Sequence, residues 1–363
     1  MKIDFPPSCS IAILWHGSEK MKTMPLAGLR FSLLLILFGL NAIFCQAQSA
    51  VVLVGSGSTV PAPLYNRWAQ EYAKGPSNIQ MRYLPVGTSE GIKDISHGSG
   101  DFGAGEAQLT DTQRKEGSLI ELPVVLIGIV PIYNLPDVRQ ELRLSGEVLA
   151  GIFLGNVKTW DAPQIVQLNP GITLPSLPIR VVNRPAGKGS NYVFTDFLSK
   201  VSSKFRAQIG ITPSPKWPVG EPAERSSDMA DKVKNRPGSI GYVEYQYAVK
   251  GNIPQAAVLN PGGSFVKAST ESITAACKAV EAPRWNSFSA SLTNAPGADT
   301  FPITSFTWIY LRIKTTDSAR AAALGDLLDW IYSQGQQFAV QEGYSELPPP
   351  LLAAVRKRVK DLQ

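Results

Sequence analysis

Short apolar runs alternate with longer amphipathic stretches along most of the chain. The run Val51–Val54 is apolar and β-branched, which is typical of a buried strand. Leu64, Trp68 and Tyr72 then recur every four residues, the spacing of one face of a helix. Because proline is tolerated in the first turn of a helix, we expect this helix to begin near Pro61.

The same succession of strand, turn and helix occurs twice more. A strand at Gln80–Leu84 precedes a short helix whose apolar face carries Ile92 and Ile95. A strand at 179–182 precedes a helix with apolar positions between Tyr192 and Val201. In all three cases the strand and the helix are joined by a turn rich in glycine and hydroxyl side chains. The three turns are Gly55–Thr59, Gly87–Ser89 and Gly187–Ser190.

The second half of the chain continues in the same style. The segments Ser239–Ala248 and Phe301–Leu311 have the apolar pattern of strands. A helical stripe of apolar residues, typical of core packing, follows at Leu324, Leu327, Leu328 and Ile331. Alternation of strands and helices favours an α/β fold with mainly parallel sheets.

Composition and charge exclude several classes of protein. With 44% hydrophobic and 18% charged residues, the chain is too apolar for disorder, and 363 residues suggest two domains. The net charge of +6 is slight and no basic tract alternates with aromatic residues, so we expect no nucleic-acid binding. Two histidines and three cysteines leave little material for a zinc site or a Ser-His triad.

The N-terminal segment resembles a targeting signal. Lys22 and Arg30 precede the apolar run Phe31–Phe44, and small residues follow, as in a secretory signal peptide. The run is shorter than the ~20 residues needed to cross a bilayer. Residues 1–47 are therefore predicted to be an N-terminal extension with a cleaved signal that exports the protein. Cys45 leaves a lipoprotein alternative open.

The three glycine-rich turns are candidate anion sites. The first backbone N–H groups of a helix have no partner inside it, and the helix dipole is positive there. A small anion can accept these hydrogen bonds, and glycine allows its close approach. The alternative is that the hydroxyls cap their own helices. Because Arg184 precedes the third turn and Lys188 lies within it, we favour one oxyanion site at which the turns converge. Neither a nucleotide P-loop nor a dinucleotide fingerprint is matched.

These residues carry a resemblance to a known family. The chain resembles the periplasmic phosphate-binding subunit of the bacterial phosphate ABC importer from about residue 50 to the C-terminus. The likeness rests on motifs that occur in the family's order. They are Gly55–Tyr65, Gly87–Lys93, Asp101–Ala104, Ile152–Gly155, Trp160–Asp161, Val193–Thr195, Trp217–Gly220, Gly241–Tyr245 and Pro302–Ser305.

The resemblance implies a two-lobed periplasmic-binding-protein fold, type II-like, with the ligand cleft between two hinged α/β domains. Lobe I would combine residues 48–128 and 255–363, and lobe II would comprise residues 129–254. A ligand that binds the closed state more tightly drives closure of such a hinge.

The resemblance also implies a ligand shell, which this chain matches incompletely. The implied ligand-binding residues are Thr59, Val60, Thr88, Glu106, Arg184, Lys188, Gly189 and Ser190. Five positions depart from the family, and at one of them Thr88 replaces the usual serine but keeps the hydroxyl. Val60 replaces an aromatic residue but keeps the backbone donor, and Glu106 replaces an aspartate that accepts a hydrogen bond from protonated phosphate. Ala186 replaces an aspartate that pairs with the arginine, and Lys188 replaces a serine.

Two of these departures change the local charge. Loss of a carboxylate at Ala186 and gain of an ammonium at Lys188 shift the formal charge by +2 if both face the cleft. A carboxylate facing the anion favours a ligand that still carries a proton. We therefore hypothesise that phosphate binds with weakened discrimination against sulfate or arsenate.

The function implied is that of an exported, periplasmic solute-binding protein. It would be a monomer that captures inorganic phosphate and delivers it to an inner-membrane ABC permease, with no cofactor, metal or catalytic residue. The alternatives are a family member that binds another oxyanion or works without a transporter and, more remotely, a phosphatase. His97 is expected at an exposed helix C-terminus, which does not suit a catalytic base.

Overall fold

The computed structural model describes residues 50–280, 288, 290–313 and 317–362. The predicted signal peptide, Cys45 and residues 1–47 lie outside this part of the chain. The residues from Ala50 onward form one compact unit. Within the described ranges, no helix combines the length and the apolar character needed to cross a membrane.

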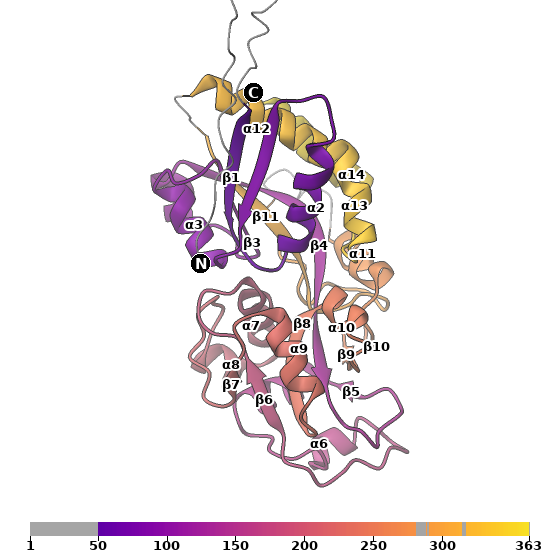
Figure 1. Cartoon of the computed structure of the whole chain (residues 1–363). Coiled ribbons are helices and arrows are strands. Elements are labelled where there is room, and N and C mark those ends of the chain that lie inside the picture. Colours follow the sequence, from indigo (N-terminus) through magenta and orange to yellow (C-terminus); the bar gives the residue numbers. More distant parts are fainter. Residues whose placement is uncertain (1–49, 281–287, 289, 314–316, 363) are drawn as a thin grey trace, which may run out of the picture. The chain divides into compact units, whose positions relative to one another are not determined.

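Five strands form the first part of the central sheet (Figure 1). The strands β1 (Val51–Gly57), β2 (Ile79–Leu84) and β3 (Phe102–Gly105) are parallel, with β1 between the other two. The long strand β11 (Thr304–Arg312) is antiparallel both to β3 and to β4 (Leu119–Tyr133). We call β1, β2, β3, β11 and residues 119–128 of β4 the first half-sheet.

Strand β4 changes its partner along its length. Its residues Leu119–Gly128 pair with β11, whereas Ile129–Tyr133 pair with β8 (Ser239–Glu244) on the other side. Strand β6 (Arg180–Asn183) lies parallel to β8, and β7 (Glu221–Pro222) lies parallel to β6. We call β8, β6, β7 and the end of β4 the second half-sheet.

The directions of the strands place strand ends of both half-sheets in one zone, the region where the two half-sheets meet. Since β11 is antiparallel to both β3 and β4, β4 runs in the same direction as β1 and β3. Strand β8 is antiparallel to β4, so β8 and β6 run the opposite way. The carboxyl ends of β1 and β3 therefore face those of β6 and β8. In open α/β sheets, ligands bind at the carboxyl ends of strands.

Helices cover both half-sheets. On the first, α2 (Ala62–Tyr72) contacts β2, α3 (Thr88–Ser96) contacts β1 and β3, and α12 (Ser318–Trp330) contacts β1. On the second, α9 (Ser226–Lys234) contacts β6 and β8, and α10 (Tyr245–Lys250) contacts β4. The helix α7 (Gly189–Val201) packs on α5 (Gly146–Phe153) and α8 (Ser203–Gln208).

The remaining elements are short or peripheral. A small second sheet contains β5 (Arg143–Leu144), β9 (Ala257–Leu259) and β10 (Phe265–Val266). The other helices are α4 (Asp111–Glu116), α6 (Pro163–Val166), α11 (Thr270–Lys278), α13 (Gln336–Gln341) and α14 (Pro349–Lys360), and a π-helix at Ile331–Gly335 continues α12 into α13.

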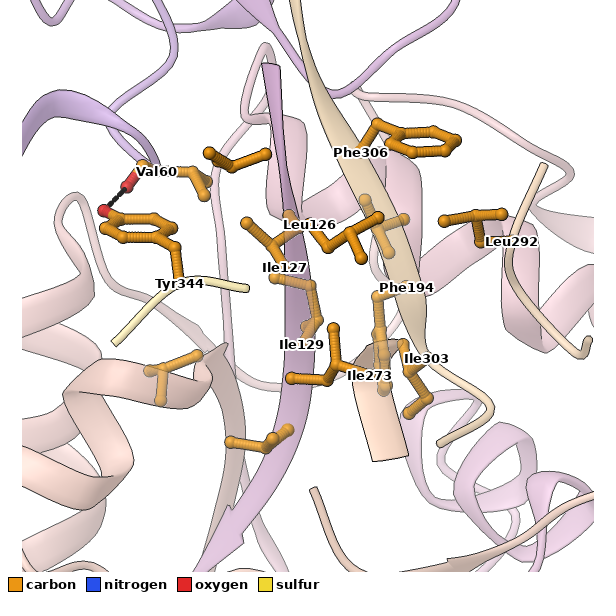
Figure 2. Close-up of a cluster of buried hydrophobic side chains, with 14 of the residues drawn as sticks. Val60, Leu126, Ile127, Ile129, Phe194, Ile273, Leu292, Ile303, Phe306 and Tyr344 are labelled. Atoms are coloured by element: carbon orange, nitrogen blue, oxygen red, sulfur yellow. Dashed lines mark hydrogen bonds between the residues drawn. The ribbon is translucent and has the colours of Figure 1, made fainter. Parts of the chain in front are cut away.

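The core follows the apolar pattern of the sequence. Leu64, Trp68 and Tyr72 are all buried on one face of α2, as their spacing predicts. The strand β4 contributes Ile127 and Ile129 to a cluster of buried side chains shown in Figure 2. This strand is buried along nearly its whole length, as expected for a strand with neighbours on both sides.

The α/β fold and most of the expected elements are confirmed, with one clear exception. The predicted strand Ser239–Ala248 ends at Glu244, and α10 occupies the rest. Tyr245 and Tyr247 alternate with other residues and imitate a strand, but Gln246 and Ala248 are the buried residues of α10. Tertiary packing overrides such a local pattern. The division into lobes at 128/129 and 254/255 stays a prediction, and the change of partner along β4 falls at the first of these boundaries.

Candidate functional site

The predicted site residues follow the carboxyl ends of strands in the zone where the half-sheets meet. Thr59 follows β1, and Glu106 directly follows β3. Arg184 directly follows β6. Thr88 is the first residue of α3, and Gly189 with Ser190 opens α7 (Figure 1).

The structure brings the three turns together. The Arg184 Nη2 atom donates a hydrogen bond to Thr59 Oγ1 over 3.3 Å. The backbone N–H of Ser89 donates to the carbonyl oxygen of Gly187 over 3.3 Å. The third turn, which is more than 80 residues from the other two in sequence, therefore shares one location with them, and these contacts join β1 and α3 to β6 and α7.

Glu106, Thr88 and Gly189 form the centre of this location. The Thr88 hydroxyl donates to Glu106 Oε2 over 3.0 Å. A Cβ atom built on Gly189 would lie 1.5 Å from the same oxygen and 2.5 Å from Thr88 Oγ1. Only glycine leaves room at position 189 for this approach, which is the close packing that the glycine-rich turn predicts.

The hydroxyls of these turns do not cap their own helices. The N-cap residues of α2, α3 and α7 are Pro61, Gly87 and Lys188, and in each case no side chain accepts a capping hydrogen bond. Thr88 points to Glu106. The side chain of Ser190 is buried, and its Oγ atom has no partner among the described residues. The capping alternative is wrong for both residues.

Several buried polar atoms in this zone lack a hydrogen-bond partner within the part of the chain that the structure describes. They are Arg184 Nε and Nη1, Glu106 Oε1, Ser190 Oγ and both carboxylate oxygens of Glu244. Native proteins satisfy nearly all buried polar groups, and leaving a buried charge unpaired costs several kcal/mol. Two guanidinium N–H groups, a hydroxyl and carboxylate acceptors together suit a small oxyanion that accepts from some groups and donates to others.

Burial raises the pKa of Glu106 to about 8, and the negative charge of Glu244 adds to this effect. Hydrogen bonds from Ser58 and Thr88 oppose the rise because they stabilise the carboxylate. The Glu106 side chain has no exposed surface. This carboxyl group therefore changes its protonation state near neutral pH, where it can accept or donate a hydrogen bond to an anion.

A set of hydrogen bonds fixes the backbone around Arg184. Tyr242 accepts from the Arg184 N–H over 3.2 Å and donates to Asn191 Oδ1 over 2.5 Å. Asn191 Nδ2 and Trp217 Nε1 both donate to the Arg184 carbonyl oxygen, over 3.3 Å and 3.1 Å. Arg184 as a whole is 1% exposed. Its backbone is held by Tyr242 of β8 and Asn191 of α7, the elements that also carry Glu244 and Ser190.

Three predicted positions differ from expectation. The Val60 N–H donates to Ser58 Oγ over 3.0 Å, so the predicted backbone donor already has a partner inside its own turn. The Lys188 ammonium lies 3.6 Å from Glu224 Oε2, and Ala186 is exposed. Because Lys188 is paired and Ala186 faces solvent, these two positions do not add a charge of +2 that faces the ligand. The hypothesis of weakened discrimination against sulfate or arsenate depended on that charge and no longer holds.

Sequence reasoning assigned no role to Glu244, although it lies in the motif Gly241–Tyr245. It is the last residue of β8 and is fully buried. A carboxylate at the carboxyl end of a buried strand was the signal that could have identified it. Ser58 belongs to the first glycine-rich turn and has no predicted role of its own. Its side chain lies within hydrogen-bonding reach of Glu106.

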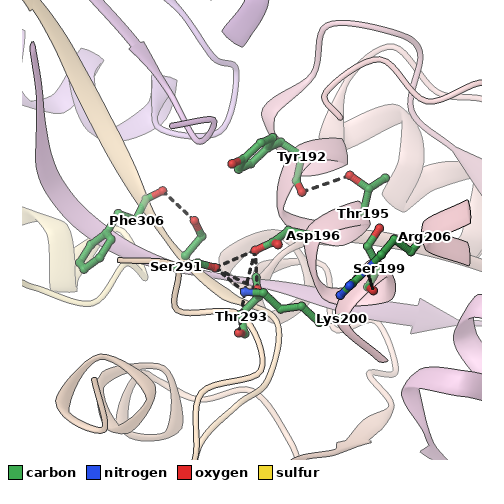
Figure 3. Close-up of polar contacts among 10 residues, drawn as sticks. Tyr192, Thr195, Asp196, Ser199, Lys200, Arg206, Ser291, Thr293 and Phe306 are labelled. Carbon is green, nitrogen blue, oxygen red and sulfur yellow. Dashed lines mark hydrogen bonds and ion pairs between the residues drawn. The ribbon is translucent and has the colours of Figure 1, made fainter. Parts of the chain in front are cut away.

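The helix α7 also contacts a distant segment through its other polar residues (Figure 3). Asp196 accepts hydrogen bonds from the hydroxyls of Ser291 and Thr293. Lys200 donates to Ser291 Oγ over 2.7 Å and to Thr293 Oγ1 over 2.6 Å. The helix that begins at the candidate site is therefore held to residues 291–293 by charged hydrogen bonds, which are stronger than neutral ones.

Comparison with known proteins agrees with this geometry. Residues 46–334 match the model of the PBP superfamily domain. The chain is 35% identical over 91% of its length to the phosphate-binding protein PstS of Pasteurella multocida, of which it covers 95%.

Two solved structures show the same fold at low identity. One is a periplasmic phosphate-binding protein, PfluDING, with bound phosphate (19% identity, TM-score 0.68, 85% of this chain and 93% of that chain). The other is a phosphate-binding protein from Stenotrophomonas maltophilia (17% identity, TM-score 0.63, 85% of this chain and 94% of that chain). The α/β fold, the match to the family model and the identity to a curated relative lead to one conclusion: the chain belongs to the PBP superfamily and, within it, to the PstS family of phosphate-binding proteins.

Proposed function

We propose that this protein binds inorganic phosphate in the zone between the two half-sheets and delivers it to an inner-membrane ABC permease. The observation that carries the proposal is the buried guanidinium of Arg184, two of whose nitrogen atoms have no partner within the described chain. A tetrahedral oxyanion placed there accepts from Arg184 and from Ser190 and satisfies both. The predicted ligand residues Thr59, Thr88 and Gly189 line the same location.

In its ionised form, Glu106 gives the site a preference for a protonated anion. Its Oε1 atom is buried and unpartnered among the described residues, and a carboxylate in that position accepts a hydrogen bond from a P–OH group. Sulfate carries no such proton at neutral pH, so its oxygen would face the carboxylate with no hydrogen between them. This arrangement favours phosphate or arsenate over sulfate.

Transport requires that ligand binding changes the conformation of the binding protein that the permease recognises. We infer lobes at 48–128 plus 255–363 and at 129–254, with the site between them and closure driven by the ligand. The contact of Arg184 with Thr59 and those of α7 with Glu106 and residues 291–293 would then form on closure. The names of the relatives support phosphate binding in the periplasm, and the predicted signal at residues 1–47 supports export.

Isothermal titration calorimetry of the purified mature protein tests the ligand. We expect tight 1:1 binding of phosphate and at least ~100-fold weaker binding of sulfate. Absence of phosphate binding would overturn the proposal, and equal affinity for both anions would favour a general oxyanion binder. Loss of high-affinity phosphate uptake in cells that lack the gene, restored by the full-length chain, tests delivery to a permease.

We infer a binding role without catalysis. His97 is exposed at the C-cap of α3, where its Nδ1 atom lies 2.7 Å from the Lys93 carbonyl oxygen. His97 therefore does not have the buried position expected of a general base. Incubation of the purified protein with p-nitrophenyl phosphate should release no nitrophenol above background. Hydrolysis by the wild type that disappears when Glu106 is substituted would contradict this inference.

A further inference from the structure

Glu244 is a buried carboxylate that the family resemblance left without a role. It is the last residue of β8 and lies opposite Ile129, the first residue of β4 that pairs with the second half-sheet. Its side chain has no exposed surface. Neither of its carboxylate oxygens has a hydrogen-bond partner within the described ranges. A buried carboxylate in this condition requires a donor from outside the described chain.

Arg184 lies beside Glu244 at the same edge of the sheet. The parallel register of β6 and β8 pairs Arg180 with Ser239 and Val181 with Ile240. Continued to the strand ends, this register sets Arg184 beside Val243, the neighbour of Glu244. The unpartnered donors of Arg184 and the unpartnered acceptors of Glu244 therefore lie on adjacent strand ends.

A molecule that joins these groups must accept hydrogen bonds from Arg184 and donate one to Glu244. Sulfate cannot donate, whereas a protonated phosphate oxygen can do both at once. Glu106 follows β3, and the charge of Glu244 acts on it, so carboxyl groups from both half-sheets meet in the same zone. When Glu106 is ionised, the two carboxylates call for a ligand with two P–OH groups, which is the phosphate monoanion.

We propose that Glu244 is a specificity-determining residue of the anion site, where it accepts a hydrogen bond from a second protonated oxygen of bound phosphate. The inference rests on the proposed function, because it requires phosphate to be the ligand. Glu244 thereby supplies a carboxylate at the site although position 186 is alanine. With Glu106 it excludes oxyanions that carry no proton.

The charged and titratable groups that act on Glu244 come from several elements. In addition to Glu106 and Arg184 they include the buried hydroxyls of Tyr242, Tyr247 and Tyr344, which respond to its charge. Burial raises the pKa of all three tyrosines, so they stay protonated near neutral pH. Among the described groups named here, Glu106 is then the one that changes charge in that range, together with the ligand itself.

Calorimetry of Glu244→Gln with phosphate and sulfate tests the inference. Glutamine has the same shape, but its amide can donate to an unprotonated oxygen. We expect the ratio of phosphate affinity to sulfate affinity to fall at least ~10-fold. We also expect the decline of phosphate affinity between about pH 6 and about pH 8 to flatten, because the variant accepts the dianion as well.

Controls separate this role from a structural one. Glu221→Gln removes a carboxylate from β7 of the same half-sheet, where Glu221 pairs with Arg236 and Lys232, and should leave the ratio within ~2-fold. Glu244→Asp keeps the negative charge but shortens the side chain by one methylene group. Its affinity ratio should lie between those of the wild type and Glu244→Gln, and it serves as the test if Glu244→Gln does not fold.

The outcomes distinguish the inference from the function on which it rests. Wild-type protein that binds no phosphate overturns both. Wild-type protein that prefers phosphate, with Glu244→Gln and Glu244→Asp retaining the same ratio and pH profile, overturns the role of Glu244 alone and leaves the phosphate site in place.

Discussion

Glu106 and Gly189 approach each other so closely that a Cβ atom on Gly189 would lie 1.5 Å from Glu106 Oε2. Glu106 follows β3 in the first half-sheet, and Gly189 opens α7 beside the second. The family resemblance implies an aspartate at this position, and the extra methylene group of Glu106 fits because residue 189 has no side chain. The longer carboxylate and the glycine therefore depend on one another, across the zone in which we place the ligand.

Gly189→Ala should reduce phosphate affinity at least ~100-fold, because the added methyl group meets Glu106 and Thr88 and keeps the two half-sheets apart. Calorimetry measures the affinity, and thermal unfolding without ligand should show a smaller change than the loss of binding. Gly75→Ala, where the added Cβ meets only one carbonyl oxygen at 3.2 Å, is the matched control. Unchanged affinity of Gly189→Ala would contradict the closed arrangement around Glu106.

Arg184→Lys should also reduce phosphate affinity by ~100-fold or more, although it keeps the positive charge. Lysine has one nitrogen atom and cannot replace the two unpartnered guanidinium donors Nε and Nη1. Arg180→Lys is the control, since Arg180 begins the same strand and is exposed. Without ligand, Arg184→Lys and Arg180→Lys should unfold at similar temperatures. Affinity of Arg184→Lys within ~3-fold of the wild type would argue against a direct contact with the anion.

The stability of the ligand-free protein should fall as pH rises from about 5 to about 8, in a way that depends on Glu106. The pKa of Glu106 is raised from 4.5 to about 8 in the folded protein, so the folded state binds its proton more tightly than the unfolded state. The resulting stabilisation is present at low pH and is lost as pH rises through the folded pKa. Glu106→Gln should remove of the order of 1–3 kcal/mol of this pH dependence.

Denaturant unfolding at several pH values measures this difference. Glu116→Gln is the control, because Glu116 is exposed at the end of α4 and should leave the pH profile unchanged. Parallel profiles for the wild type and Glu106→Gln would show that the buried carboxyl group does not bind an additional proton in the folded state.

Much of the fold could be predicted because local pattern and tertiary packing agree. The period of Leu64, Trp68 and Tyr72 places the buried face of α2, and the turn sequences mark where each strand passes into a helix. The error at Tyr245–Lys250 has the opposite origin. The alternation of Tyr245 and Tyr247 suits a strand, and only contacts of α10 with β4 and α9 favour the helix that forms there.

The candidate site could be predicted only in part, because its geometry depends on contacts between distant segments. The turns and Arg184 were found from glycine spacing and the family resemblance. The pairing of Lys188 with Glu224 and the hydrogen bond between Val60 and Ser58 depend on side-chain directions that no spacing specifies. Glu244 was overlooked because a single glutamate carries no pattern, and its significance comes from burial without a partner.

Thr293→Val should weaken phosphate binding by about 3- to 30-fold, because it removes a hydroxyl that contacts both Asp196 and Lys200 of α7. The contact joins α7 to a segment of the inferred other lobe, so it stabilises only the state in which these elements meet. The loss should therefore lie mainly in faster dissociation of phosphate, measured by stopped-flow displacement. Thr274→Val is the control, since the Thr274 hydroxyl donates within α11 to Thr270. Equal dissociation rates for Thr293→Val and the wild type would mean that α7 meets residues 291–293 with or without ligand, and that this contact does not take part in closure.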